Sequence, residues 1–395
     1  MSKEYVEMEV NGEKAYIRKD ALGELKKVNA VVFDCDGVLI DIRGSYNQAI
    51  RETVAYFLET LTGFTPSENA VSKELIYLFR KTGGFNNDWD TTYTILLLIL
   101  SRLPKQFQEA FEKYTSLSLG EADITRRFLS VKNGVRKEYD PTNLDLQMAK
   151  LEDVLKQFAL TFDSFGIASL EDKLKNIPEL YAAAKSWLAY PGEVGTSVLT
   201  TAFEEIFCGS QLFKVLYGKD PRFYNGRGLI ENERVIIRPE TLDRLTRIFG
   251  EANFGIASGR PAKLAEFTLK ELLKRFDSKA TVFLEDIEEV ERETFRDQRV
   301  KVNLKKPNPF SLFHSLKALK HVASALYVGD SMEDAIMVKT ADTVDSRFLF
   351  AGVYRHSDLK EDIISDFLKG EAELVLPSVN ELPVVLNAVK GGETL

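Results

Sequence analysis

Short apolar runs that end in polar or acidic residues constrain this chain more than any other feature of its sequence. There are four of them, at residues 29–34, 252–257, 280–284 and 324–328. A run that is apolar on both faces is typical of a strand buried in the middle of a parallel sheet. Amphipathic stretches at 241–249 and 261–276 alternate with these runs. The alternation predicts an α/β fold with a Rossmann-like parallel sheet and helices on both of its faces.

A long stretch between the first and second runs has a different character. Residues 44–224 contain one helical pattern after another and no convincing strand; for example, Ile50, Val54 and Leu61 recur at helical spacing. The run Ile95–Leu100 is apolar on all sides, which predicts a helix buried inside a bundle. The sequence therefore predicts an α/β core in two pieces, interrupted by a large all-helical insertion.

The N-terminus adds a third part. Val6, Met8 and Val10 alternate with polar residues and lead into Asn11-Gly12, which is the strongest short signal for a β-hairpin. The expected domains are an N-terminal hairpin or extension at 1–27, a core of 28–43 plus 228–395, and the helical insertion at 44–227.

Composition and charge exclude several classes of function. The 395 residues carry 52 Lys and Arg against 60 Asp and Glu, a formal net charge of −8, which argues against a generic nucleic-acid binder and against attachment to an anionic membrane surface. The longest purely apolar run, 95–100, is far shorter than the roughly 20 residues needed to cross a bilayer. With two cysteines and no signal-peptide pattern, a cytoplasmic protein is expected. An anionic substrate would need a local cation.

The first strand ends in a pair of acids. Asp34 and Asp36 are separated by one residue, and residues i and i+2 of an extended segment point the same way. Two carboxylates that converge suit a hard divalent ion such as Mg²⁺, and Gly37 permits the sharp turn that a tight site requires. The alternative interpretation is an ordinary Asp-x-Asp-Gly surface turn.

Three further groups of polar residues are candidates for the same site. Ser258-Gly259 follows the second run and offers a hydroxyl and a backbone N–H at a helix start, where anions bind; the alternative is a plain helix N-cap. Lys306 precedes a rigid Pro-Asn-Pro turn, although a lone lysine usually lies on a solvated surface. Asp330 and Asp334 follow the fourth run, and Asp334 alone could simply complement a helix dipole.

The four groups occur in the order Asp-x-Asp, Ser-Gly, Lys-Pro and Gly-Asp-x-x-x-Asp, and three of them lie directly at the end of a buried run. As a set they resemble the four motifs of the haloacid dehalogenase superfamily, over about residues 28–43 and 230–390. The resemblance implies that Asp34 is a nucleophile that forms an aspartyl-phosphate. It also implies that Asp36 first protonates the leaving oxygen and then activates water.

The resemblance further implies a Mg²⁺ site and a phosphate site. Three residues would hold Mg²⁺: Asp34 and Asp330 through their carboxylates and Asp36 through its backbone carbonyl. Ser258 and the N–H of Gly259 would bind phosphoryl oxygens. Lys306 would neutralise charge on the nucleophile and the phosphoryl group, and Asp334 would orient Lys306 or a metal-bound water.

An Asp at position 36 goes with the phosphatases and phosphomutases of the superfamily, and the dehalogenase branch lacks it. By the same resemblance, the insertion would be a cap that closes over the site and reads the leaving group. Within the insertion, Asn86, Asn87, Asp88 and Trp89 could form a substrate loop. The alternative is a helix N-cap at Asn87 or Asp88, with Trp89 in the core of the insertion.

The leading hypothesis is a Mg²⁺-dependent phosphomonoester hydrolase, a phosphatase that acts on a small phosphorylated metabolite. A sugar-phosphate phosphomutase would use the same pair of acids. A hypothesis of another class is a non-catalytic binding protein that docks a partner on its helical insertion. Nucleic acids and membranes are not expected as partners, and the oligomeric state stays open.

Overall fold

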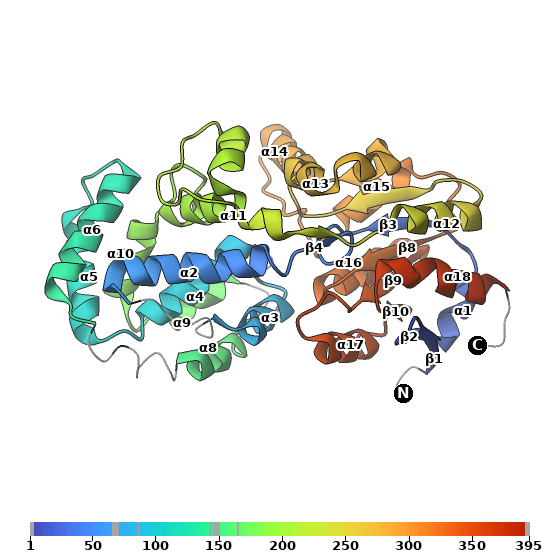
Figure 1. The fold of residues 1–395 in the computed structure, drawn as a ribbon, viewed down its shortest axis with the longest axis horizontal. Coiled ribbons are helices and arrows are strands. Elements are labelled where there is room, and N and C mark those ends of the chain that lie inside the picture. Colours follow the sequence, from blue (N-terminus) through green and yellow to red (C-terminus); the bar gives the residue numbers. More distant parts are fainter. Residues whose placement is uncertain are drawn as a thin grey trace. The chain divides into compact units, whose positions relative to one another are not determined.

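The computed structural model describes residues 4–64, 71–85, 87–141, 144, 151–163 and 166–391. Contacts within the chain divide it into two units (Figure 1). The core unit comprises Met1–Arg43 and Glu233–Leu395, and the helical unit comprises Gly44–Asn232. The chain therefore leaves the core unit once and returns to it once. The sequence patterns placed this return at residue 228.

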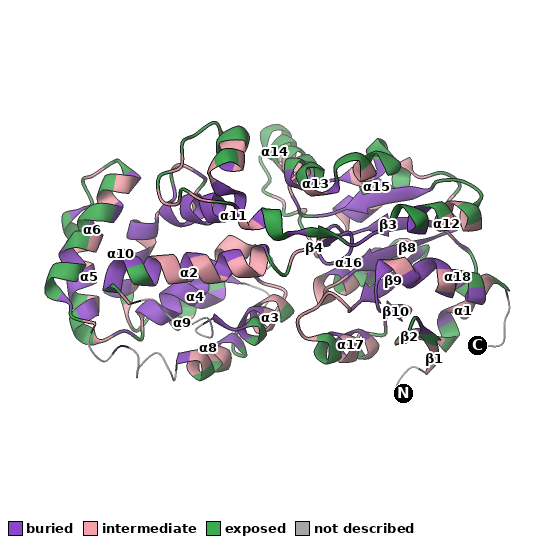
Figure 2. Ribbon diagram, viewed as in Figure 1, coloured by how far each residue is buried: buried purple, intermediate pink, exposed green. Residues whose placement is uncertain are grey.

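An eight-stranded sheet forms the centre of the core unit. Its strands lie in the order β1-β2-β10-β9-β8-β3-β6-β7. β3 (Val28–Phe33) lies between β8 (Ser324–Gly329) and β6 (Phe254–Ala257). The other parallel strands are β7 (Thr281–Val282), β9 (Phe348–Val353) and β10 (Leu374–Leu376). Figure 2 shows that the central strands are buried. The predicted α/β fold with a parallel sheet is confirmed.

Two of the parallel strands were missed by the sequence analysis. β9 and β10 were not predicted because neither is an apolar run that ends in acidic or small polar residues. β9 leads instead into Tyr354-Arg355, and β10 has only three residues. Both strands extend the sheet beyond β8, on the side away from β6.

The predicted N-terminal hairpin is confirmed. β1 (Tyr5–Val10) and β2 (Glu13–Arg18) pair antiparallel, and Asn11 and Gly12 join them with φ angles of 54° and 81°. Two positive φ angles are what a tight hairpin turn requires. β2 also pairs antiparallel with β10, so that the hairpin adds two strands to the edge of the sheet.

Helices cover both faces of this sheet. On one face, alternate strand residues such as Val31 and Val328 share an apolar core with α12 (Pro239–Phe249) and α18 (Leu382–Gly391). On the other face, the rings of Phe350 and Phe367 lie 5.4 Å apart. The helices of this second face are α15 (Phe310–Ala318), α16 (Met332–Asp342) and α17 (Lys360–Lys369). The remaining helices of the core unit are α1 (Leu22–Leu25), α13 (Ala262–Leu269) and α14 (Leu284–Gln298).

A short pair of strands marks the place where the chain leaves and re-enters the core unit. β4 (Ile40–Asp41) and β5 (Arg234–Val235) pair antiparallel, with Ile40 opposite Val235. The outgoing and returning segments therefore run side by side.

The helical unit contains no β-strand among its described residues. Its helices are α2 (Tyr46–Thr62), α3 (Lys73–Lys81), α4 (Asp88–Leu100), α5 (Lys105–Leu117), α6 (Ile124–Glu138), α8 (Leu151–Ala159), α9 (Ile167–Lys173), α10 (Pro178–Leu188) and α11 (Val198–Tyr217). Every residue of α4 from Thr91 to Leu100 is buried, which confirms the helix predicted at the centre of the bundle. In the part of the chain that the structure describes, no helix combines the length and hydropathy needed to span a membrane.

Candidate active site

The register of the central strands brings three of the predicted motifs to one edge of the sheet. Phe33, the last residue of β3, is paired with Val328 of β8 and with Ile256 of β6. The carboxyl ends of these parallel strands therefore lie next to one another, which is where such sheets bind ligands. The strands lead directly into three predicted site residues, Asp34, Asp330 and Ser258.

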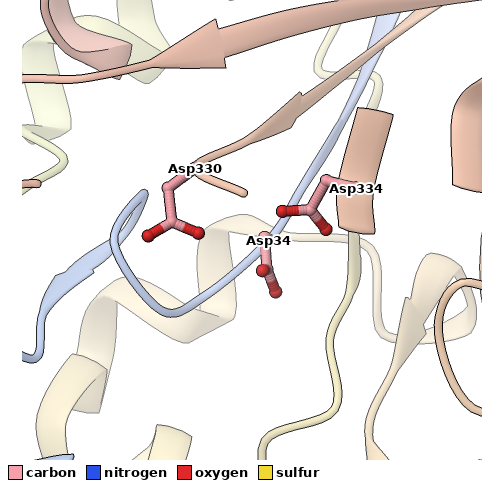
Figure 3. A group of neighbouring side chains, drawn as sticks. All are labelled: Asp34, Asp330 and Asp334. Carbon is pink, nitrogen blue, oxygen red and sulfur yellow. The ribbon is translucent and has the colours of Figure 1, made fainter. Parts of the chain in front are cut away.

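Three acids form a carboxylate cluster at this edge (Figure 3). Asp34, Asp330 and Asp334 each contribute an oxygen, and these oxygens lie within 4.8 Å of one another. Oxygen donors at this spacing are the ligands that a hard divalent cation prefers. The donor set of the carboxylate cluster therefore fits such an ion.

Lys306 supplies a positive charge beside the carboxylate cluster. Its Nζ atom lies 2.9 Å from Asp34 Oδ2 and 2.8 Å from Asp334 Oδ1, and its side chain is only 10% exposed. Burial by itself would lower the pKa of Lys306, but the carboxylates of Asp334 and Asp34 raise this pKa well above its usual value. The lysine is therefore a fixed cation held between two acids.

Tyr327 holds Lys306 in place from β8. Its hydroxyl accepts a hydrogen bond from Lys306 Nζ (2.7 Å) and donates one to the carbonyl of Ala257 (2.9 Å). This residue was not predicted from the sequence. A tyrosine inside an otherwise apolar run was the available signal, because a buried phenol normally has a hydrogen-bond partner.

Burial also acts on Asp34. It raises the pKa of this carboxyl to about 6, and Lys306 opposes the rise. Asp34 Oδ1 accepts a hydrogen bond from the backbone N–H of Cys35 at 2.8 Å. A cation beside Asp34 would favour the ionised form. Because the cluster has three carboxylates and Lys306 pairs with two of them, the electrostatics of the site favour a further positive charge.

Asp334 is bound on both of its oxygens. Oδ1 accepts from Lys306, and Oδ2 accepts from the hydroxyl of Ser331 at 2.7 Å in the capping box that starts α16. Asp334 is therefore an acid in the first turn of a helix and a partner of Lys306 at the same time. Both interpretations drawn from the sequence apply to it.

Asp36 lies outside the carboxylate cluster found among the described residues. Its Oδ1 atom is 2.6 Å from Nη1 of Arg260, and Nη2 of Arg260 is 2.6 Å from Glu233 Oε2. The carboxylate of Asp36 thus binds a buried guanidinium, and its convergence with Asp34 on a metal ion stays a prediction. Arg260 and Glu233 were not predicted from the sequence. A charged residue so soon after a buried run was a signal for Arg260, whereas Glu233 carried none.

Ser258 and Gly259 form the turn after β6. Ser258 is buried, and its Oγ accepts a hydrogen bond from the N–H of Arg260 at 3.3 Å. Gly259 is exposed. Helix α13 begins at Ala262 with Pro261 as its N-cap, so the alternative interpretation of Ser258 as the cap of this helix is wrong. The role of both residues in phosphate binding stays a prediction.

The predicted substrate loop makes contacts within the helical unit. Asn86 lies outside the described residues. Asn87 caps α4 by accepting from the N–H of Trp89 at 2.8 Å, and Asp88 pairs with Arg80 at 2.9 Å. The indole N–H of Trp89 donates to Glu204 Oε1 at 2.9 Å. These contacts match the alternative of a helix N-cap at Asn87, whereas Trp89 is only partly buried and does not lie in the core of the insertion. A role in substrate recognition stays a prediction.

Comparison with known families identifies the class of protein. Residues 28–342 match the family of haloacid dehalogenase-like hydrolases. Since this match spans most of the chain, the protein belongs to the haloacid dehalogenase-like hydrolases. The resemblance read from the four motifs is thereby confirmed. Among curated proteins, none matches the sequence.

Solved structures resemble this chain at low sequence identity. An X-ray structure from the Northeast Structural Genomics Consortium shares 20% identity with a TM-score of 0.63, over 91% of this chain and 99% of the other. A phosphatase from Thermococcus thioreducens shares 21% identity over 86% and 99% of the two chains, with a TM-score of 0.46. A haloacid dehalogenase-like hydrolase from Bacteroides fragilis shares 14% over 90% and 100%, with a TM-score of 0.37. The first likeness supports the fold, and the other two are too distant to support an argument.

Proposed function

We propose that this hydrolase is a Mg²⁺-dependent phosphatase that removes the phosphoryl group from a small phosphorylated metabolite through an aspartyl-phosphate on Asp34. The placement of Lys306 carries the proposal, because its Nζ lies 2.9 Å from Asp34 Oδ2 and 2.8 Å from Asp334 Oδ1. A carboxylate nucleophile beside a fixed cation suits attack on a phosphoryl group, whose negative charge must be offset as the bonds change.

In the first step, Asp34 attacks phosphorus and the bond from phosphorus to the leaving oxygen breaks. Lys306 and the backbone N–H of Cys35 hold one oxygen of Asp34 each, so the nucleophile has its orientation before the substrate arrives. Lys306 offsets negative charge on the phosphoryl oxygens. The hydroxyl of Ser258 and the N–H of Gly259 would donate hydrogen bonds to the same oxygens.

Asp36 would handle the proton in both steps. As an acid it donates a proton to the leaving oxygen, and as a carboxylate it then accepts a proton from the water that attacks the phosphorus of the aspartyl-phosphate. The second step releases inorganic phosphate and restores the carboxylate of Asp34. The side chain of Asp36 is 25% exposed, which leaves it open to a leaving group.

Oxygen donors of this edge would hold the metal. Asp34 and Asp330 would bind Mg²⁺ through their carboxylates and Asp36 through its backbone carbonyl, a donor set of the kind that Mg²⁺ prefers. Asp334 would instead orient Lys306, whose Nζ donates to Asp334 Oδ1 at 2.8 Å. The bound ion would supply Lewis-acid stabilisation of the phosphoryl charge.

Phosphate release from a panel of small phosphate esters, with and without Mg²⁺, tests the proposal. We expect release from at least one ester, loss of release on chelation of the metal, and recovery when Mg²⁺ is returned. Asp34→Asn should abolish release because an amide does not act as the nucleophile. As a control, Asp243→Asn removes an exposed acid that pairs with Arg275 and should leave the rate unchanged.

Two results would replace the proposal with one of its rivals. Isomerisation of a sugar phosphate without release of phosphate would identify a phosphomutase. An Asp34→Asn variant that equals the wild type on every ester would favour a non-catalytic binding protein.

A further inference from the structure

One buried guanidinium joins three segments of the core unit. Arg260 Nη1 donates to Asp36 Oδ1, and Nη2 donates to Glu233 Oε2, both at 2.6 Å. The side chains of Arg260 and Glu233 are fully buried, and that of Asp36 is 25% exposed. Asp36 follows β3, Arg260 follows β6, and Glu233 is the first residue of the core unit after the helical unit. The three residues are called the Arg260 bridge below.

The Arg260 bridge is built so that one end is fixed. Glu233 Oε2 also accepts a hydrogen bond from Thr268 Oγ1 at 2.6 Å, and Arg260 Nη2 lies 3.3 Å from the carbonyl of Leu264. Both partners belong to α13. Because the guanidinium is a planar fork, fixing Nη2 also fixes the direction in which Nη1 points. Nη1 points at the carboxylate of Asp36.

Packing alone does not account for such a bridge. Moving a charged group out of water costs several kcal/mol, and apolar side chains of similar volume often replace a buried ion pair at no cost in stability. A role in the chemistry of the site would explain why the bridge is present. Of its three residues only Asp36 is partly exposed. Asp36 is also the residue that transfers the proton in the proposed mechanism.

We propose that Arg260, anchored by Glu233, is the positioning residue for Asp36 and holds its carboxylate where it meets the leaving oxygen. This inference rests on the proposed function, because it requires Asp36 to exchange a proton with that oxygen. The side chain of Arg260 is fully buried, so it acts through Asp36 rather than by touching the substrate.

The dependence of the rate on the leaving group separates positioning from a purely structural role. 4-Nitrophenolate departs readily without a proton, whereas phenolate is more basic and departs poorly unless it is protonated. A misplaced acid therefore slows hydrolysis of phenyl phosphate more than that of 4-nitrophenyl phosphate. A general loss of structure slows both reactions alike. Any two esters that the wild type hydrolyses and that differ in this way serve the same purpose.

The double variant Arg260→Gln with Glu233→Gln removes one positive and one negative charge and so leaves no unpaired buried charge between them. We expect kcat/KM, which reports the step in which the leaving group departs, to fall about 30-fold more on phenyl phosphate than on 4-nitrophenyl phosphate. This is a part of the 10²–10⁴-fold that acid–base catalysis contributes. The matched control is Arg275→Gln with Asp243→Asn, an exposed pair at the same distance of 2.6 Å. It should leave both rates unchanged.

A second variant keeps the test decisive if the first does not fold. Arg260→Lys retains the charge but replaces the fork with a single ammonium, and it should show the same preferential loss. Folding of each variant is checked by thermal unfolding followed by circular dichroism. An equal loss of kcat/KM on both esters, or no loss in a folded variant, would overturn the positioning role. A wild-type protein that releases phosphate from no ester would instead contradict the proposed function.

Discussion

At residue 37 the chain turns with a φ of 72°, a conformation that favours glycine. The open side of Gly37 faces Asp330, and a Cβ atom at this position would lie 1.9 Å from Asp330 Oδ2. The loop that carries Asp34 and Asp36 can therefore approach Asp330 only because residue 37 has no side chain. A single missing methyl group allows the carboxylate cluster to form.

Gly37→Ala should accordingly disrupt the site. The new methyl group would displace Asp330, and a displacement of about 1 Å at a reacting centre can cost roughly 100-fold in rate. We expect a loss of this size in phosphate release, together with weaker Mg²⁺ binding by isothermal titration calorimetry. Gly23→Ala is the matched control, because a Cβ atom there meets nothing within 4 Å. Full activity of Gly37→Ala would refute this account of the turn.

The residues of the site were predictable to different degrees. Asp34, Lys306 and Asp330 were found because each lies in a short motif whose order along the chain is characteristic. Arg260 and Tyr327 were missed because their role depends on a partner that is distant in sequence. Asp36 and Arg260 are 224 positions apart, and no local sequence pattern predicts the hydrogen bond between them.

Elements of the helical unit are joined by a buried acid. Glu204 on α11 accepts hydrogen bonds from the indole N–H of Trp89 on α4 (2.9 Å) and from the hydroxyl of Tyr217 (2.8 Å). Burial raises the pKa of Glu204 above 4.5, and the hydrogen bonds from Tyr217 and Trp89 oppose the rise. A titratable group is therefore buried at the contact between the two helices.

Ionisation of Glu204 should weaken the folded state. The pKa of Glu204 is higher in the folded state than in the unfolded state. At pH values between these two pKa values, the folded protein therefore binds more protons than the unfolded protein. The free energy of unfolding consequently falls as the pH rises from the lower pKa to the higher one. Glu204→Gln removes this titration. The free energy of unfolding of the variant, relative to that of the wild type, should rise by about 1.4 kcal/mol for each unit by which the pKa is raised. Urea unfolding at a series of pH values from 4.5 upward measures this difference.

The exposed acid Glu138 provides a comparison of opposite sign. The hydrogen bond from Lys113 lowers the pKa of Glu138, so its contribution is present above 4.5 and is lost as the pH falls. The free energy of unfolding of Glu138→Gln should therefore fall relative to that of the wild type as the pH rises toward 4.5, and the pH series for this pair begins below 4.5. A stability difference for Glu204→Gln that does not change with pH would show that burial does not control this carboxyl.

For the whole molecule, local patterns predicted the architecture well where each element carries its own signal. The runs at 29–34 and 324–328 are apolar on both faces, so each run by itself predicts a strand, β3 or β8, without reference to the neighbouring strands. The three-residue strand β10 carries no such signal, and it forms because β9 and the hairpin strand β2 lie on either side of it. Short strands of this kind form through pairing with their neighbours, so local sequence patterns do not predict them.

The place where the chain leaves the core unit suggests that this unit folds by itself. The side chain of Asn232 donates to the carbonyl of Gly44 at 3.1 Å, so the two ends of the helical unit are close enough for a short turn. The apolar core that contains Val31, Leu245 and Val328 draws its residues from both pieces of the core unit. The carboxylate cluster and Lys306 also belong to this unit.

Replacing residues 45–231 with a four-residue Gly/Ser linker should therefore leave a folded core. We expect a single cooperative thermal transition by circular dichroism, because the sheet and the helices on both of its faces are retained. Mg²⁺ binding by calorimetry should persist in the shortened protein, and Asp330→Asn introduced into it should abolish that binding, because Asp330 is an expected metal ligand. A shortened protein that shows no cooperative transition would mean that the core unit requires the helical unit in order to fold.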